Sequence, residues 1–117
     1  MKTQPRRSRP GHRRPAPAPR RSLQQLRAAI DALDRRLVPL LAARTDLVRR
    51  VVRFKSTRAA VRAPQRAARV VANARRLARR HAMDPALAAR IYRAMIAAFV
   101  DFEMVELARR RARRRPR

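Results

Sequence analysis

Two cations on one helical stripe are the first side chains in this sequence whose placement suggests chemistry. Arg44 stands between Leu40 and Leu47, where the alternating three- and four-residue spacing of leucines predicts an apolar residue. Lys55 follows 11 residues later. Since each helical residue turns by about 100°, both side chains point to one face within about 20°. Buried cations are costly unless an anion pairs with them, so the stripe indicates a bound anion. The alternative is that both side chains extend past the core into solvent.

Lysine is also rare in this chain, because Lys2 and Lys55 are the only lysines among 33 basic residues. Lysine offers a compact point charge and arginine a planar fork of donors. We therefore interpret Lys55 as a position where the chemistry requires a compact charged donor. The alternative is that lysine occurs there by chance. Arg27 precedes Arg44 by 17 residues, which is about 100° around the helix. It is placed to serve the site of a partner chain in a dimer, or else it is an ordinary surface arginine.

Glu103, near the C-terminus, is a charged residue on the predicted apolar face of a helix, as Arg44 is in the first helix. Ile96 and Phe99 precede it by seven and four residues, on the same face of a helix, and Phe102 is adjacent. Partial desolvation of a carboxyl group favours its neutral form, which can donate a hydrogen bond. The alternative is an ordinary salt bridge to an arginine.

A long first helix is predicted to carry the cationic stripe. Ala, Leu and Arg, which favour helices, dominate the chain, and the only glycine is Gly11. The helix is expected to run from an N-cap at Ser22 to about Lys55, and Pro39 predicts either a kink or a division into two helices. Its apolar seam is too long for one small chain to cover, so a partner chain is expected. The seam consists of Leu23, Leu26, Ile30, Leu33, Leu37, Leu40, Leu47 and Val51.

Two further helices complete an all-α bundle. One is predicted from Pro64 to about His81, a cation that suits a helix C-terminus. The other is predicted from the start signal Asp84-Pro85 to about Ala108. The residues expected to face inward are Ala67, Val70, Val71, Ala74 and Leu77 in the former, and Leu87, Ile91, Met95, Phe99 and Phe102 in the latter.

The distribution of charge predicts one domain with two tails. Residues 1–22 hold eight cations and residues 109–117 hold seven, without any acid in either block. The stretch between them holds 18 basic and seven acidic residues, so the net charge of +26 divides as +8, +11 and +7. Blocks of like charge rarely order, and we expect disordered tails at 1–22 and 109–117 around a domain at 23–108. Because a domain of roughly 86 residues buries only about 60–65% of its unfolded surface, oligomerisation is expected to help it.

Composition excludes several classes of site. The chain has no cysteine, and its two histidines, His12 and His81, are too scattered for a metal site, so no metal or cofactor is expected. No apolar run approaches the roughly 18 residues of a membrane span. The first residues lack the apolar segment of a secretory signal. We expect a cytoplasmic protein without membrane contact.

The residues singled out above resemble those of the all-α chorismate mutase family in residue type and in spacing. Residues 26–34 read LRAAIDALD and residues 41–44 read LAAR, which is similar to the first helix of that family. The elements Arg53-Phe54-Lys55 and Ala63-Pro64-Gln65-Arg66 continue the resemblance, and Asp84-Pro85 with the last helix through Glu103 completes it. It covers about residues 23–108.

This resemblance implies an intertwined homodimer of three-helix chains, with active sites shared between subunits and no cofactor. It maps a substrate-carboxylate arginine onto Arg44 and the lysine at the ether oxygen onto Lys55. Glu103 falls on a second residue that contacts the ether oxygen. Arg66 matches the substrate-binding arginine of the second helix, and Arg27 matches an arginine supplied by the partner chain. The implied substrate is a small dianion of the chorismate class.

Two departures leave the exact reaction open. Typical mutases carry acids around the second-helix arginine, whereas Ala63 and Ala67 stand there in this chain. This loss and the R-F-K element resemble the isochorismate pyruvate lyase branch, which makes salicylate and pyruvate, but that branch has glutamine where this chain has Glu103. Conversion of chorismate to prephenate is the first expectation. Isochorismate pyruvate lyase and an amino-chorismate mutase of secondary metabolism are the alternatives.

Two other classes of protein are weighed against an enzyme. The Arg-rich tails would bind nucleic-acid phosphates non-specifically and with steep salt dependence. Since 15 of the 33 cations lie in the tails, deletion of the tails should abolish such binding and spare an enzyme. A non-catalytic helical dimer that regulates a partner is the other alternative, and it would turn over neither substrate.

Overall fold

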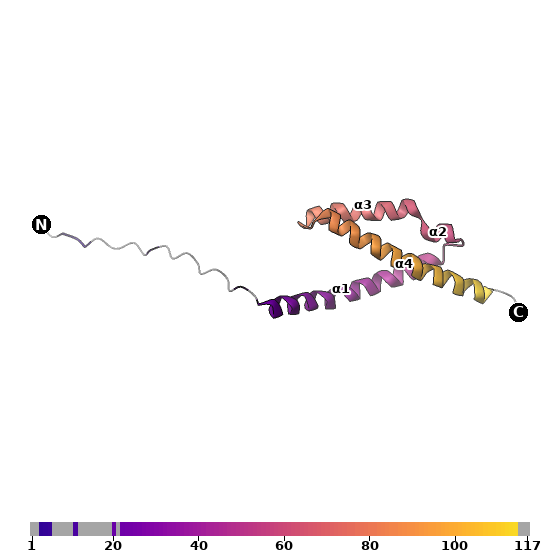
Figure 1. The fold of residues 1–117 in the computed structure, drawn as a ribbon, viewed down its shortest axis with the longest axis horizontal. Helices are drawn as coiled ribbons and strands as arrows, with labels where there is room; N and C mark the ends of the chain where they lie inside the picture. Colours follow the sequence, from indigo (N-terminus) through magenta and orange to yellow (C-terminus); the bar gives the residue numbers. More distant parts are fainter. Residues whose placement is uncertain (1–2, 6–10, 12–19, 21, 115–117) are drawn as a thin grey trace. The chain divides into compact units, whose positions relative to one another are not determined.

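The chain is all-α throughout the part that the structure describes, which comprises residues 3–5, 11, 20 and 22–114 of a computed structural model (Figure 1). The helices within residues 22–114 are α1 (Leu23–Val52), α2 (Arg58–Arg62), α3 (Pro64–Arg80) and α4 (Pro85–Arg114). No strand occurs among the described residues. The predicted fold class is confirmed, while the pairing of two chains stays a prediction. The expected disorder of the first tail falls mostly on residues outside the described ones.

The chain divides into two compact units, Met1–Asp34 and Arg35–Arg117, and each is considered by itself. In the first unit α1 begins with a capping box. The Ser22 hydroxyl accepts a hydrogen bond from the Gln25 backbone N–H at 3.1 Å, and the Gln25 side-chain oxygen accepts one from the Ser22 N–H at 2.8 Å. These reciprocal bonds satisfy two of the free N–H groups at a helix start, so the predicted N-cap at Ser22 is confirmed.

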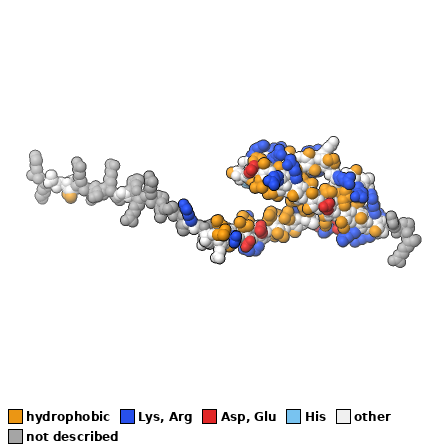
Figure 2. All heavy atoms as spheres, viewed as in Figure 1, with side chains coloured by type: hydrophobic (Ala, Val, Ile, Leu, Met, Phe, Trp, Pro, Cys, Tyr) orange, Lys and Arg blue, Asp and Glu red, His pale blue; other side chains and the backbone are white. Residues whose placement is uncertain are grey.

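Helix α1 runs through Pro39 as one element, so the predicted division into two helices does not occur. Every residue of its apolar seam is exposed, with exposed fractions between 46% at Val51 and 68% at Leu40. Figure 2 shows hydrophobic side chains at the surface along this helix. A continuous exposed stripe of this length is unusual for a lone soluble chain, which is why a covering partner remains our prediction.

A short helix that the sequence analysis missed lies between α1 and α3. Helix α2 begins after Thr57, whose hydroxyl accepts a hydrogen bond from the Ala60 N–H at 3.1 Å. It ends at Ala63, which adopts the left-handed conformation (φ 34°, ψ 63°) directly before Pro64 at the start of α3. Five residues between two breaks are too few for a periodic pattern, so the helix left no signal in the sequence.

The turn between α3 and α4 carries the predicted caps. His81 is the C-cap of α3. The next residue, Ala82, has φ 54°, and the Met83 N–H donates to the Ala78 carbonyl at 2.8 Å, which is the pattern of a Schellman motif. At the start of α4 the Asp84 carboxylate accepts from the Ala86 N–H at 2.9 Å, so the predicted N-cap is confirmed.

Two packing regions hold the second unit together. The end of α1, α2 and α4 meet in one cluster, which consists of Val52, Val61 and Leu107 with Val100 and Met104 beside them. Helices α3 and α4 pack along each other (Figure 1). Apart from Glu103 and Leu107, the buried residues of these two helices are alanines: Ala74, Ala78, Ala88 and Ala89.

The predicted inward faces are therefore partly wrong. Leu77, Leu87 and Ile91 are 42–48% exposed, because the close contact of α3 with α4 uses alanines and leaves the larger side chains outside it. Helix α4 also continues to Arg114, past the predicted end at Ala108, and residues 109–114 are helical where a disordered tail was expected. Ala and Arg are strong helix formers, and contacts described below hold this segment against the rest of the unit. Within the described residues, no helix is both long and apolar enough to cross a membrane.

Candidate active site

A cavity of about 430 Å³ in the second unit gathers most of the charged residues that the sequence analysis singled out. Its walls come from the second half of α1, the loop after it, the α2–α3 junction and α4. The apolar part consists of Val48, Val51, Val61, Val70, Ile96, Phe99 and Val100. The charged part consists of Arg44, Lys55, Arg62, Arg66, Arg69 and Glu103. A volume of this size suits a small organic ligand.

Arg44 reaches the cavity from α1 and is half-buried. Its guanidinium carbon lies 4.5 Å from the centroid of the Phe99 ring on α4. Such stacking stabilises a cation that has left bulk water and fixes the plane of its donors. Arg44 therefore lines the cavity, and its binding of an anion stays a prediction.

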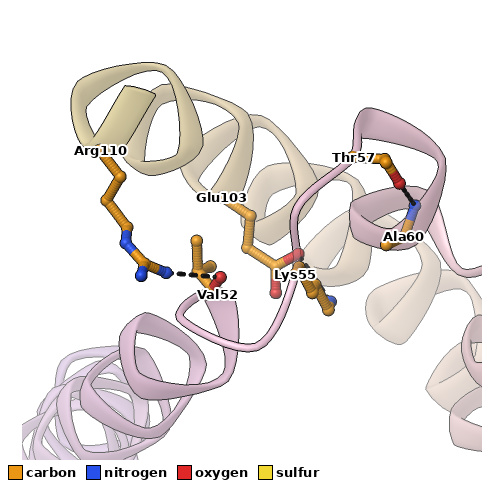
Figure 3. Close-up of polar contacts among 6 residues, drawn as sticks. All are labelled: Val52, Lys55, Thr57, Ala60, Glu103 and Arg110. Carbon is orange, nitrogen blue, oxygen red and sulfur yellow. Dashed lines mark hydrogen bonds and ion pairs between the residues drawn. The ribbon is translucent and has the colours of Figure 1, made fainter. Parts of the chain in front are cut away.

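Lys55 and Glu103 meet inside the same cavity (Figure 3). The Lys55 Nζ donates to Glu103 Oε2 at 3.1 Å, and the two side chains are only 19% and 9% exposed. Glu103 was expected either as a partly desolvated carboxyl or in a salt bridge to an arginine. It is indeed buried, but its partner is Lys55, 48 residues away in sequence. A desolvated pair of this kind holds both groups in defined positions.

Three arginines from the α2–α3 region add further positive charge. Arg66 was expected in the site, and it lines the cavity from the first turn of α3 with an exposed side chain. Arg62 and Arg69 were not predicted. Arg69 follows Arg66 by three residues on the same face of α3, which was an available signal, but arginine is too common here for spacing to single it out. Arg62 ends α2, and the left-handed turn at Ala63 separates it from α3, so helical spacing gave no signal for it.

The charge of the cavity is strongly unbalanced. Among the described residues that line it, Glu103 is the only acid beside five cations, Arg44, Lys55, Arg62, Arg66 and Arg69. Like charges gathered around an apolar hollow repel one another, and an anion in the hollow would relieve that repulsion. A neighbouring hollow shares Arg44, Arg66 and Arg69 with the cavity and continues along α3 past Asn73 to Arg76. Figure 2 shows Lys and Arg side chains over much of the visible surface of α3 and α4.

Arg27 belongs to the unit that ends at Asp34, where its side chain is exposed on α1. That Arg27 contributes to the active site of a partner chain stays a prediction. Within the described residues, no group of three or more His, Cys, Asp or Glu is placed to hold a metal ion. The cavity itself offers arginines, which can bind carboxylates, and the Lys55 ammonium, which can donate to an oxygen placed beside it.

The fold and the cavity define the class of this protein, a small all-α domain with a cationic cavity between its helices. Comparison with protein families narrows this class, since the model for chorismate mutase type II matches residues 26–113. The chain belongs to this family, and the resemblance seen in the sequence is confirmed. The match includes residues 109–113, in agreement with the observed length of α4. A comparison with curated proteins finds no match.

Proposed function

We propose that this protein is a chorismate mutase that converts chorismate to prephenate. The reaction is a rearrangement within one molecule, in which the ether C–O bond breaks and a new C–C bond forms. It needs no nucleophile, redox partner or leaving group outside the substrate. Catalysis then consists of holding the folded conformer and stabilising charge on the ether oxygen. The observation that carries the proposal is the partly buried Lys55–Glu103 pair in a cavity that Arg44 also lines.

Each charged residue of the cavity has a role in this proposal. Arg44, held over Phe99, presents its planar fork to one substrate carboxylate. Arg66 also lines the cavity and binds a second polar group of the substrate. Lys55 donates to the ether oxygen, where negative charge grows in the transition state. Glu103 lies beside the same oxygen and orients the Lys55 ammonium toward it. Arg27 of a second copy of the chain completes the site.

The pairing of Lys55 with Glu103 has a consequence for substrate binding. In the structure the carboxylate accepts from Lys55, which is the opposite of donating to a substrate oxygen. A substrate oxygen that enters between the two groups replaces the carboxylate as the acceptor of Lys55. The displaced carboxylate then faces a negatively charged ligand, and the two groups repel each other.

A lyase acting on isochorismate is the second candidate, and one observation favours it. Ala63 and Ala67 line the cavity, at the positions where the resemblance leads us to expect acids in typical mutases. In that reaction the ether C–O bond breaks while a ring hydrogen moves to the enolpyruvyl methylene carbon, so that salicylate and pyruvate form. An amino-chorismate would differ only in the ring substituent near the same alanines.

The test is to offer the purified full-length protein chorismate and isochorismate separately and to identify the products by chromatography. Prephenate from chorismate supports the mutase, and salicylate with pyruvate from isochorismate supports the lyase. Lys55→Ala should lower kcat by roughly 100-fold or more, as for the loss of an oxyanion donor. Arg90→Ala, a change of the same charge at an exposed position of α4, is the control and should leave turnover unchanged. Failure to consume either substrate with the fold intact would exclude both candidates and leave a regulatory dimer.

A further inference from the structure

The loop that carries Lys55, residues 53–57, is attached to α4 at two points. The last carbonyls of a helix lack partners within the helix. At the end of α1 the Val52 carbonyl accepts two hydrogen bonds, one from the Lys55 backbone N–H at 3.0 Å and one from Arg110 Nη1 at 2.9 Å (Figure 3). Beyond Lys55, the Ser56 carbonyl accepts from Arg111 Nη2 at 2.6 Å. The backbone is thus held by an arginine on each side of Lys55.

Apolar packing does little for this loop. Its one large hydrophobic side chain, Phe54, is 91% exposed, and Arg53, Ser56 and Thr57 are exposed as well. The loop would have considerable freedom if apolar burial alone restrained it. Hydrogen bonds from a guanidinium to a carbonyl are charge-assisted and stronger than neutral ones. The two arginine contacts are therefore the main restraints that the structure shows on the loop, besides the Lys55–Glu103 pair itself.

One face of α4 supplies all of these contacts. Counted from Glu103, the other residues follow after four, seven and eight positions, which places all of them on one side of the helix: Leu107, Arg110 and Arg111. Leu107 is 4% exposed and packs with Val52 and Val61. The packing of Leu107 thus fixes the register in which Glu103 meets Lys55 on one side and Arg110 meets the end of α1 on the other.

We propose that Arg110 and Arg111 are positioning residues, which anchor the loop of residues 53–57 to α4 and so set the Lys55 ammonium against Glu103 and the substrate. The kinetic part of this inference rests on the proposed function. The arginines touch neither the substrate nor Glu103 but act through the backbone on both sides of Lys55. The C-terminal turns of α4, beyond the predicted domain end, are in this view part of the catalytic apparatus.

The test compares Arg110→Ala, Arg111→Ala and the double variant with Arg113→Ala, which removes the same charge from an exposed position of the same helix segment. Hydrogen exchange of the backbone amides of residues 53–57 is measured first, since it does not depend on activity. We expect roughly tenfold faster exchange in the double variant and no change in Arg113→Ala. Equal exchange in the two proteins would overturn the anchor. If the double variant does not fold, the single Arg111→Ala variant carries the same comparison.

The kinetic arm separates positioning from general loss of structure. In the double variant kcat should fall about tenfold or more, because a small displacement of a donor is costly, while KM changes little. Arg110→Lys, which keeps a charged donor, should recover part of kcat. In a Lys55→Ala background the arginine changes should cost little further, since the group that they position is gone. Independent, additive losses would overturn the inference. If the unaltered protein consumes neither substrate, the proposed function fails, and the exchange comparison still decides whether α4 anchors the loop.

Discussion

The partly buried Lys55–Glu103 pair joins two side chains from different parts of the sequence in one cavity. In the proposed reaction the Lys55 ammonium donates to the ether oxygen. The Glu103 carboxylate accepts from Lys55 and places negative charge where the transition state also develops it. The charge of Glu103 should therefore affect the rate.

The first prediction concerns the charge of Glu103. Glu103→Gln keeps the size of the side chain, removes its negative charge and adds an amide donor, so kcat/KM should rise because the ether oxygen then has a second donor beside Lys55. The measurement is kcat/KM of both proteins. An unaltered kcat/KM in Glu103→Gln would mean that the charge of this side chain does not affect the reaction.

Arg44 permits a second prediction at the same scale. Its guanidinium is stacked on Phe99, and its planar fork matches a carboxylate. Arg44→Lys keeps the charge and loses both features, so kcat/KM should fall by roughly tenfold to 100-fold, mostly through KM. Arg49→Lys, in the same helix but at an exposed position, is the matched control. Equal kinetics for the two variants would mean that only the charge at position 44 matters.

At the scale of the elements, the joins between helices are tight and are made without glycine. The Schellman motif after α3 places Ala82 at φ 54°, in the left-handed region that alanine avoids. Ala63 is in the same region between α2 and α3. Both turns therefore hold strain that the packing of α3 on α4 has to offset.

The third prediction uses this strain. Ala82→Gly should raise the free energy of unfolding by about 0.5–1 kcal/mol, since glycine adopts the left-handed conformation without the steric cost. The same change at Ala72, an exposed position inside α3, should lower it by about 1 kcal/mol. Urea denaturation of both variants measures the difference. A destabilised Ala82→Gly variant would contradict the assigned turn geometry.

At the scale of the whole molecule, the exposed seam of α1 and the excess of positive charge are the dominant features. The exposed seam is the reason to expect a homodimer. The positive charge is the reason to expect that the protein captures a small dianion rapidly. Non-specific contact of the N-terminal tail with nucleic acid stays a prediction, because most of that tail lies outside the described residues.

The fourth prediction concerns the seam. Ile30→Asp, in the middle of the first half of α1, should prevent a second chain from covering the stripe and shift the protein toward monomer. Asp34→Asn, at an exposed position nearby, should leave the oligomeric state unchanged. Analytical ultracentrifugation measures both. Activity should fall with dimer content if Arg27 of one chain serves the site of the other, and a fully active monomer would exclude a shared site.

The fifth prediction concerns charge. The row of arginines that continues from the cavity along α3 should attract the dianion from a distance, so kcat/KM should fall as salt is raised from about 0.01 to 0.15 M. Arg76→Gln, which lines only the neighbouring hollow, should weaken this dependence without changing kcat. A rate independent of salt would mean that encounter with the substrate does not limit the reaction.

The sequence by itself determined the local features of this protein. Helix periodicity and the caps at Ser22 and Asp84 follow from interactions within a few residues of each other. The predicted helical stripe of Arg44 and Lys55 is wrong in one respect, because α1 ends at Val52 and Lys55 reaches the cavity from the loop after the helix. The spacing of these residues was also specific enough to indicate the chorismate mutase family.

Only the tertiary structure decided which distant groups meet. The ion pair of Lys55 with Glu103, the addition of Arg62 and Arg69 to the cavity, and the anchoring of the Lys55 loop by Arg110 depend on how α4 packs against the end of α1 and against α3. Because the chain contains so many arginines, the sequence alone offers many equivalent partners for each acceptor group. The packing of Leu107 with Val52 and of the alanines between α3 and α4 selects one register, and that register determines which cations enter the cavity.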